Sequence, residues 1–394
     1  MDGFRFDVQT SVYYGRNALQ DHQDVLDGFG KKAVIVTSQF IEGYKNIGLE
    51  DAKALFDAKG IEYKVIDYTI PNPPVENIEQ MYEDTKDFEF DFVVGIGGGS
   101  SLDAAKALAQ LTDWRKDDPE RSAEDIFFGY GKPYDNYKNM CRIPVITMPT
   151  TAGTGSEVTG GAVLTRNDLH LKIAMNQWLY PEVSFVDPRY VEHSPLFLLD
   201  TGVIDALAHG IEGAIRQKDH IYAASNIMNE GLSKIAFKLF AEFKDNLLNN
   251  TLTAEDYDKI SCASMIQGVA FMQSCTCIPH GLGYPLSHYY DVCHGLSCGI
   301  FLGEWLKNFK DQSLVQEVVE DCGFKNSDEF ADYVRALTNR DVELEVTDAE
   351  IQEWTDAFMK QQVWRLESNP EELTRDDIYT IYRRALAKYI KEEK

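Results

Sequence analysis

The stretch DFVVGIGGGSSLDAAK, residues 91–106, decides how this chain folds. It begins as an apolar run rich in valine, passes through three glycines and a serine, and ends in an alanine-rich segment of helical composition. Such a strand–glycine–helix turn lets the backbone approach a pyrophosphate, which the free N–H groups and the dipole of the helix N-terminus favour. The glycines alone are weak evidence, because a tight turn also needs them for steric reasons.

A second glycine-bearing turn strengthens the nucleotide interpretation. The sequence MPTTAGTGSE, residues 148–157, follows another apolar run, IPVIT, at residues 143–147. Its small hydroxyl side chains and backbone amides suit hydrogen bonds to a phosphate or to the carboxamide of a nicotinamide.

The first half of the chain alternates between strand-like and helix-like segments. The predicted strands are residues 32–37, 61–67 and 91–96, and the predicted helices are residues 46–60 and 75–87. This alternation is typical of βαβ units in a parallel sheet, which binds ligands at the carboxyl ends of its strands. We therefore predict a Rossmann-like α/β nucleotide-binding domain over residues 1–187. Its glycines run GGGS rather than in the usual GxGxxG order, and residues 113–141 are expected to form an excursion.

After the Asp187–Pro188 pair, strand-like runs largely disappear. Long amphipathic stretches follow at residues 221–243, 256–275, 295–308, 314–322 and 348–361. We predict an all-helical domain over residues 188–394, and this domain holds the candidate metal ligands.

Asp205 and His209 lie four residues apart in VIDALAHGIEG, residues 203–213, so one face of a helix would carry both side chains. His280 and His294 follow later in the chain. One carboxylate and three imidazoles suit a divalent ion such as iron or zinc. Each histidine taken alone is better explained as a core or surface residue. Cys293 would be a soft ligand, although a buried thiol explains it more simply.

The composition fits a globular protein with two domains, because 394 residues exceed what one core usually spans and the 44% apolar content is ordinary. The formal net charge of −26 argues against binding nucleic acid or an anionic membrane. The sequence contains no run of about eighteen apolar residues, so we predict no membrane span. The first residues lack the pattern of a secretory signal. Seven scattered cysteines fit reduced thiols, so we expect a cytoplasmic protein.

Taken together, these motifs resemble the iron-containing (group III) alcohol dehydrogenases. The resemblance rests on GGGSSLDAAK at residues 97–106, PTTAGTGSE at residues 149–157, and the spacings Asp205-x3-His209 and His280-x13-His294. Smaller matches are PNP at residues 71–73, VDP at residues 186–188 and NPEELT at residues 369–374. The order and spacing of the motifs cover nearly the whole chain.

The resemblance implies a metal-dependent alcohol dehydrogenase that transfers a hydride between NAD(P)(H) and a small alcohol or aldehyde, as a homodimer. Iron is the expected metal and zinc the alternative, held by Asp205, His209, His280 and His294. Residues expected to bind the coenzyme are Ser38, Asn72, Gly97, Gly98, Gly99, Ser100, Asp103, Thr150, Thr151, Thr154 and Lys172. Ala270 and Phe271 resemble positions that line the substrate pocket, although core packing explains them equally well.

Two positions depart from the family pattern. Many members carry a further histidine where this chain has Tyr284, and a phenol with a reference pKa near 10 is a poor base at neutral pH. Tyr284 is thus the only candidate catalytic residue beyond the metal ligands, and His288 is expected to serve packing or the surface. Ser38 stands where NAD-specific relatives commonly have aspartate, which favours NADP(H) over NAD(H), unless Ser38 merely ends a strand.

Two alternatives stay open. The first is a glycerol dehydrogenase- or dehydroquinate synthase-like enzyme, which pairs the same cofactors on the same fold. A phosphorylated substrate would require lysines and arginines near the ligands, and residues 194–215 contain none. The second alternative is a catalytically silent binding protein, against which the complete set of candidate ligands and both loops argue.

Overall fold

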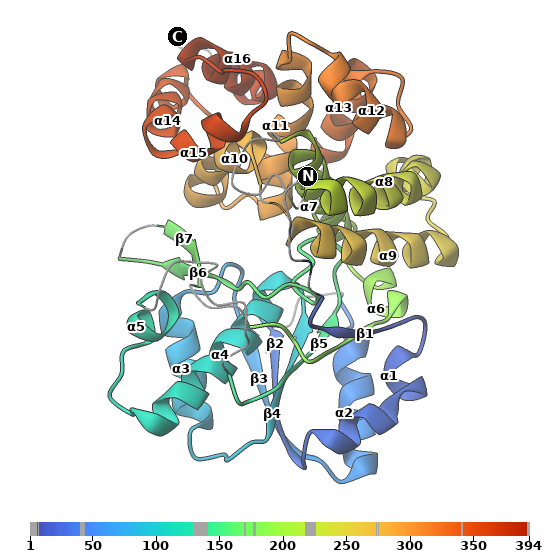
Figure 1. Ribbon diagram of the computed structural model, residues 1–394, viewed down its shortest axis with the longest axis vertical. Helices are drawn as coiled ribbons and strands as arrows, with labels where there is room; N and C mark the ends of the chain where they lie inside the picture. The colour runs from blue at the N-terminus through green and yellow to red at the C-terminus, as the bar shows by residue number, and fades with distance from the viewer. Residues whose placement is uncertain are drawn as a thin grey trace. The chain divides into compact units, whose positions relative to one another are not determined.

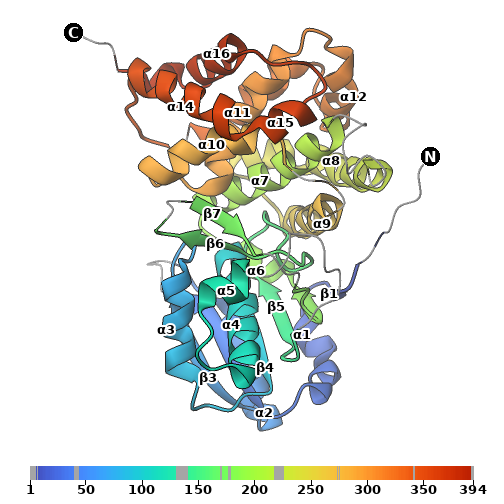
Figure 2. The same cartoon turned by 60° about the vertical axis from the view of Figure 1, so that its left-hand side comes forward.

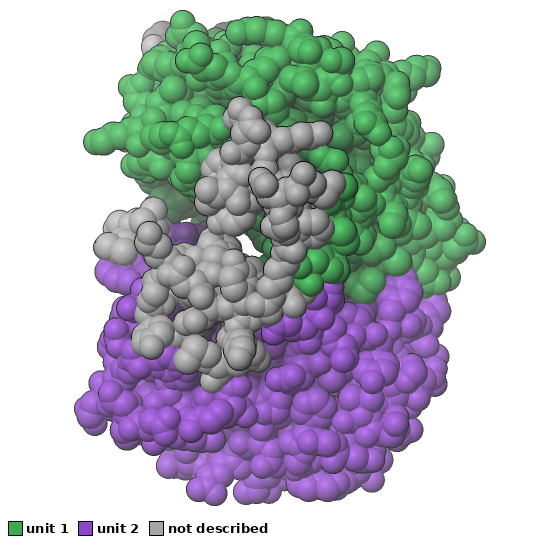
Figure 3. Space-filling model, in the orientation of Figure 1, with its two compact units in different colours: residues 1–6, 196–394 green, residues 7–195 purple. Residues whose placement is uncertain are grey.

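The computed structural model describes residues 6, 8–39, 44–129, 141–168, 171–175, 179–216, 226–272, 274, 276–339 and 342–391. The chain divides into two compact units, which Figure 3 colours separately. Unit 2 is Asp7–Pro195, and unit 1 is Leu196–Lys394 together with Met1–Phe6. Within the described ranges, no helix is long and apolar enough to cross a membrane.

Unit 2 is built on a six-stranded parallel sheet, in the strand order β1-β8-β5-β4-β2-β3 (Figures 1 and 2). Its strands are β1 (Ser11–Tyr14), β2 (Lys32–Ser38), β3 (Glu62–Thr69), β4 (Phe92–Gly97), β5 (Val145–Pro149) and β8 (Val183–Val186). A short antiparallel hairpin, β6 (Val163–Arg166) and β7 (Leu171–Ala174), stands apart from this sheet. The predicted parallel, Rossmann-like sheet is confirmed.

Both faces of this sheet are apolar. Alternate residues of a strand point to opposite faces, so an apolar run contributes to both. In β2, Val34 and Val36 join one core cluster, whereas Ala33 and Ile35 join another. The first cluster contains residues of α3 (Val75–Thr85), α4 (Gly99–Asp117) and α5 (Ala123–Phe128). The second contains residues of α1 (Ala18–Asp21), α2 (Ile47–Lys59) and α6 (Pro188–Glu192). Helices therefore cover both faces.

The excursion predicted at residues 113–141 is in part regular structure. Helix α4 continues to Asp117, and α5 begins after Ser122, whose hydroxyl accepts a hydrogen bond from the N–H of Asp125. Phe127 is fully buried in the core cluster of that face, which explains why this charged segment folds back as a helix. Residues 130–140 of the predicted excursion lie outside the described residues.

Unit 1 is helical in its described residues, apart from one isolated bridge between Val346 and Ile390. Its α-helices are α7 (Leu196–Ile215), α8 (Asn226–Asn249), α9 (Ala254–Phe271), α10 (Ile278–Tyr289), α11 (His294–Asn308), α12 (Ser313–Asp321), α13 (Ser327–Thr338), α14 (Asp348–Gln361), α15 (Val363–Ser368) and α16 (Arg375–Ala385). The predicted all-helical character of this part is confirmed.

Helix α7 lies at the centre of unit 1. It is buried on nearly all sides and packs against α8, α9 and α11. Gly295, in the first turn of α11, allows the closest of these approaches. A Cβ atom added there would lie 2.8 Å from the Cβ of Asp205 and closer still to the carbonyl oxygen of Thr201. The absence of a side chain thus lets the start of α11 meet α7 beside Asp205.

Candidate metal centre and coenzyme loops

The structure brings the four predicted metal ligands together within unit 1. Asp205 and His209 lie one turn apart on α7, His280 lies on α10, and His294 is the first residue of α11. The Nε2 atoms of His209, His280 and His294 lie 3.9, 3.7 and 3.9 Å from Oδ1 of Asp205. These distances are too long for hydrogen bonds, and they suit atoms that surround a common ion.

The burial of these groups also fits a metal ion. Asp205, His209 and His280 are at most 6% exposed, whereas the side chain of His294 is 33% exposed. Nδ1 of His209 and Nε2 of His280 are buried without a hydrogen-bond partner among the described residues. Leaving a buried polar group unsatisfied costs about 1–3 kcal/mol, and an ion contacting Nε2 of His280 would offset that cost there. Burial, with His209 alongside, lowers the pKa of His280 well below its usual value, which keeps the imidazole neutral.

Glu212 orients His280 from the opposite side of the ring. It lies one turn after His209 on α7, is fully buried, and its Oε1 atom lies 2.6 Å from Nδ1 of His280. Its other oxygen accepts a hydrogen bond from the N–H of Cys277. Burial raises the pKa of Glu212 to about 7. A carboxyl group on Nδ1 selects the tautomer whose Nε2 lone pair points toward Asp205. The sequence interpretation missed this residue.

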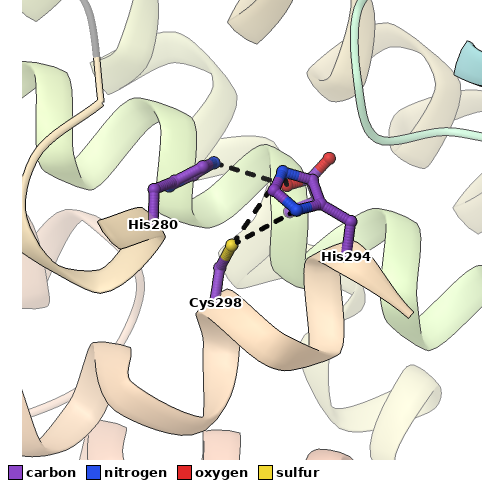
Figure 4. Close-up of side chains that lie close together, drawn as sticks. His280, His294 and Cys298 are labelled. Carbon is purple, nitrogen blue, oxygen red and sulfur yellow. Dashed lines mark hydrogen bonds and ion pairs between the residues drawn. The ribbon is translucent and has the colours of Figure 1, made fainter. Parts of the chain in front are cut away.

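A sulfur atom belongs to the same cluster and was also missed. Cys298 follows His294 by one helical turn, and its Sγ lies 3.8 and 4.0 Å from the two ring nitrogens of His294. Ligand atoms of Asp205, His280, His294 and Cys298 all lie within 4.8 Å of one another, and Figure 4 shows the sulfur beside both rings. Cys293, the cysteine considered from sequence, is the half-buried N-cap residue of α11 and is not a member of this group.

Tyr284 lies one turn after His280 on α10. Its hydroxyl accepts a hydrogen bond of 2.9 Å from Nη2 of Arg365, whose Nη1 donates to the carbonyl oxygen of Cys277. Arg365 is buried, so it fixes both the Tyr284 hydroxyl and the backbone just before α10.

The remaining candidates, Phe271, Ala270 and His288, lie in different environments. The ring of Phe271 lies 4.6 Å from the ring of His209, so Phe271 is an apolar neighbour of the ligands. Ala270 is fully buried, and its carbonyl oxygen accepts a hydrogen bond from Asn229. His288 is exposed and stacks edge-on with Tyr289, 4.7 Å away.

In unit 2 the two glycine loops begin side by side, because Gly97 of β4 pairs with Pro149 of β5. Gly97 has φ of 151°, a conformation that favours glycine, and its carbonyl oxygen accepts a hydrogen bond from the N–H of Thr150. A Cβ atom on Gly99 would lie 2.7 Å from Oγ1 of Thr154. One on Gly98 would lie 3.2 Å from Oγ1 of Thr151. The two loops therefore pack directly against each other.

Four more coenzyme candidates lie near these loops or at the same sheet edge. Asn72 has φ of 52°, and its N–H donates to Oγ of Ser100 at 3.1 Å. Its carbonyl oxygen accepts a hydrogen bond from Thr165, the hairpin residue that pairs with Lys172. Ser38 ends β2 at the carboxyl edge of the sheet, where the neighbouring strand β4 also ends.

Asp103 is occupied in holding the second loop. Its Oδ1 accepts a hydrogen bond of 2.5 Å from the hydroxyl of Ser156, and its Oδ2 accepts one from the N–H of Val163. The fully buried Lys106 completes this network. Its Nζ donates at 2.7 to 2.9 Å to the carbonyl oxygens of Ser156, Thr159 and Gly161 and to the Ser156 hydroxyl. Burial raises the pKa of Asp103 and lowers that of Lys106 to about 8.

The chain combines a parallel-sheet unit that carries paired glycine loops with a helical unit that carries an Asp/His cluster. These features define a class of proteins that combine a nucleotide-binding fold with a candidate metal centre. A family model described as iron-containing alcohol dehydrogenase matches residues 9–188. A model of the C-terminal part of the Fe-containing alcohol dehydrogenase family matches residues 199–386. The chain belongs to the iron-containing alcohol dehydrogenase family.

Individual relatives agree with this assignment. A solved structure of an iron-containing alcohol dehydrogenase from Thermotoga maritima has a TM-score of 0.80 and 30% identity, covering 98% of this chain and 100% of that one. Alcohol dehydrogenase 4 of Schizosaccharomyces pombe is 28% identical over 301 residues, which cover 75% of this chain and 66% of the relative. The NADPH-dependent butanol dehydrogenase of Clostridium saccharobutylicum is 28% identical over 301 residues, or 76% of this chain and 72% of the relative.

These matches confirm the family predicted from sequence and the enzyme class that goes with it, oxidoreductases that act on alcohols. The alternative of a glycerol dehydrogenase- or dehydroquinate synthase-like enzyme is not favoured. The chain spans just under two thirds of the length of the S. pombe relative, so its substrate and coenzyme are matters for proposal.

Proposed function

We propose that this protein is a metal-dependent alcohol dehydrogenase and aldehyde reductase that moves a hydride between NADP(H) and a small alcohol or aldehyde. Asp205, His209, His280 and His294 hold a divalent ion, iron by family membership with zinc as the alternative. The observation that carries the proposal is the convergence of three imidazole Nε2 atoms on one buried carboxylate oxygen.

The ligand set suits the chemistry of an alcohol. A divalent ion supplies a Lewis acid for the hydroxyl or carbonyl oxygen of the substrate. Only one of the four proposed ligands carries a negative charge, so the set leaves part of a divalent charge uncompensated. Glu212 holds His280 in the ligating tautomer, and the ring of Phe271 packs against the ring of His209.

The coenzyme is held by residues of unit 2. The first N–H groups of α4 lack partners within the helix and, with the helix dipole, favour the pyrophosphate. Gly98 and Gly99 allow Thr151 and Thr154 to pack against this turn, so that the two hydroxyls lie beside the start of α4. Asn72 and Ser100 support the same turn through their mutual hydrogen bond. Lys172, on the neighbouring hairpin, is proposed to contact the coenzyme.

The preference for NADP(H) rests on Ser38. A serine at the end of β2 avoids the charge repulsion that an aspartate would exert on the extra phosphate, and it donates a hydrogen bond to that phosphate. The similarity to an NADPH-dependent butanol dehydrogenase supports this choice. Steady-state kinetics with both coenzymes test it, and a clearly higher kcat/KM with NADH would contradict it.

The substrate oxygen also exchanges a proton, which needs a path separate from that of the hydride. Tyr284, one turn from His280 and oriented by Arg365, is a candidate proton donor within unit 1. The alternative is exchange through the ribose of the nicotinamide and water. A Tyr284→Phe variant with unchanged kcat across the pH range would favour the second path.

The deciding experiment measures NAD(P)H consumption with a panel of aldehydes and ketones after metal-free protein is loaded with ferrous iron or zinc. His280→Ala and His294→Ala should lose bound metal and reduce turnover by at least about 100-fold, since losing an outer partner alone typically costs 10–100-fold. His288→Ala is the matched control, because His288 is an exposed histidine on the same helix as His280.

A His280→Ala protein with full metal content and near-normal turnover would show that the ligand assignment is wrong. The homodimer and the cytoplasmic location stay predictions from the sequence, and sedimentation equilibrium tests the first of them.

A further inference from the structure

The helix that begins at the first glycine loop carries a buried cation that the proposed function does not use. Lys106 lies in the first half of α4, and its side chain is fully buried (Figure 1). Its Nζ atom lies 2.7, 2.9 and 2.8 Å from the carbonyl oxygens of Ser156, Thr159 and Gly161. Carbonyl oxygens that converge in this way repel one another unless a cation lies between them, so the turn that they form depends on the ammonium.

Asp103 binds the same stretch of chain from one turn earlier on the same face of α4. Its Oδ1 accepts a hydrogen bond of 2.5 Å from the Ser156 hydroxyl, and its Oδ2 accepts one of 2.9 Å from the N–H of Val163. The Ser156 hydroxyl also lies 2.8 Å from Nζ of Lys106, so it joins the two side chains. Together they hold residues 156–163, which run from the end of the second glycine loop to the start of the β6–β7 hairpin.

Neither side chain is suited to contact the coenzyme itself. The ammonium of Lys106 is buried and already has four acceptors for its three protons. A carboxylate at Asp103 would repel a pyrophosphate. The proposed coenzyme contacts lie instead on both sides of the held segment, with Thr151 and Thr154 before it and Lys172 after it.

We propose that Asp103 and Lys106 are positioning residues for the coenzyme, which hold the second loop and the hairpin in their binding conformation without contacting it. This inference rests on the proposed coenzyme site. A loop that is ordered in advance costs less to bind than one that the ligand must order. Breaking the link through Ser156 should therefore weaken coenzyme binding by about tenfold, which corresponds to ordering one or two side chains.

Fluorescence titrations of Asp103→Asn and Ser156→Ala with NADPH and NADH test this. Asparagine offers one acceptor oxygen where the carboxylate offers two, and alanine removes the hydroxyl that joins Asp103 to Lys106. Each variant should raise the dissociation constant of the coenzyme that the wild type prefers by about tenfold. In steady-state kinetics the KM for that coenzyme should rise by more than kcat falls. Because both substitutions break the same hydrogen bond, the double variant should bind little worse than the weaker single variant.

Asp113→Asn is the matched control. Asp113 is a buried carboxylate farther along α4, and its oxygens accept hydrogen bonds from the backbone N–H and the Nε of Arg142 rather than from the second loop. Its substitution should lower the free energy of unfolding and leave the dissociation constant of the coenzyme unchanged. A general loss of stability in unit 2 is thereby separated from a displaced coenzyme loop.

The inference is overturned if Ser156→Ala binds the coenzyme within about twofold of the wild type, or if Asp113→Asn weakens binding as much as Asp103→Asn does. Fully additive losses in the double variant would also overturn it, because they would show that the two residues act independently. Ser156→Ala keeps both charged groups, so it decides the matter even if Asp103→Asn fails to fold. If the wild-type protein binds neither NADPH nor NADH, the proposed function fails instead.

Discussion

Replacing Glu212 by glutamine should weaken metal binding, although Glu212 is not itself a proposed ligand. Both carboxylate oxygens of Glu212 accept a hydrogen bond, one from Nδ1–H of His280 and one from the N–H of Cys277. Glutamine offers a single acceptor oxygen, so its NH2 group must face one of these two donors. Either His280 loses the partner that orients it, or the buried N–H of Cys277 is left unsatisfied.

The expected size follows from the role of such partners in other metal sites. Loss of the group that orients a ligating histidine typically lowers metal affinity by 10–100-fold, or about 1.4–2.7 kcal/mol. Competition with a chromophoric chelator, starting from metal-free protein, measures the dissociation constant for zinc in the wild-type and Glu212→Gln proteins. The variant should bind zinc more weakly by that factor.

The matched control is Glu304→Gln. Glu304 is a buried carboxylate on α11 of the same unit, but its partners are Arg335, at 2.6 Å, and Lys307, at 3.4 Å, rather than a ligand. Its substitution should leave the zinc dissociation constant unchanged, even if it lowers stability. A Glu212→Gln protein that binds zinc within twofold of the wild type would refute the orienting role.

Three further predictions concern unit 2. Ser38→Asp should raise the KM for NADPH by at least about tenfold through like-charge repulsion while largely sparing NADH, and equal effects in steady-state kinetics would count against Ser38 as the phosphate contact. Lys106→Met removes a buried ammonium that donates to three carbonyls and a hydroxyl, so chemical denaturation should show a loss of about 3–5 kcal/mol. The exposed control Lys86→Met should cost much less, and a similar value for both would contradict the anchoring role. Burial raises the pKa of Glu157 from 4.5 to about 7. The contribution of its protonated carboxyl to the free energy of unfolding is therefore complete below pH 4.5 and is lost as the pH rises through 7. The unfolding free energy of Glu157→Gln relative to wild type should therefore rise by about 3 kcal/mol across that window, and a flat difference would show that the carboxyl titrates normally.

The fold could be predicted where local pattern and tertiary environment agree. The valine-rich run of β4 and its glycines show in sequence because a strand buried on both faces needs apolar residues throughout. The short strands β1 and β8 were missed, since four residues give too little pattern to separate a strand from a loop. The hairpin of β6 and β7 was missed for the same reason.

The candidate site could be predicted from sequence where its residues lie one helical turn apart. Asp205 and His209 stand out because four residues make one helical turn, and the same rule applied to His294 would have found Cys298. Glu212 carried a weaker signal, a carboxylate one turn from His209 in a mostly apolar helix. That Asp103 binds Ser156 of the second loop could not be predicted, because only the folded sheet brings them together.

The proposed ligands come from α7 and from the consecutive helices α10 and α11, which follow much later in the chain. An ion held by all of them would act on unit 1 as a reversible cross-link, closing long stretches of chain much as a disulfide does. Because the unfolded chain has no such preformed site, ion binding becomes folding free energy, about 2.7 kcal/mol when the free ion stands at 100 times its dissociation constant. Metal supply would then set how long unit 1 survives heat or protease, separately from its role in catalysis.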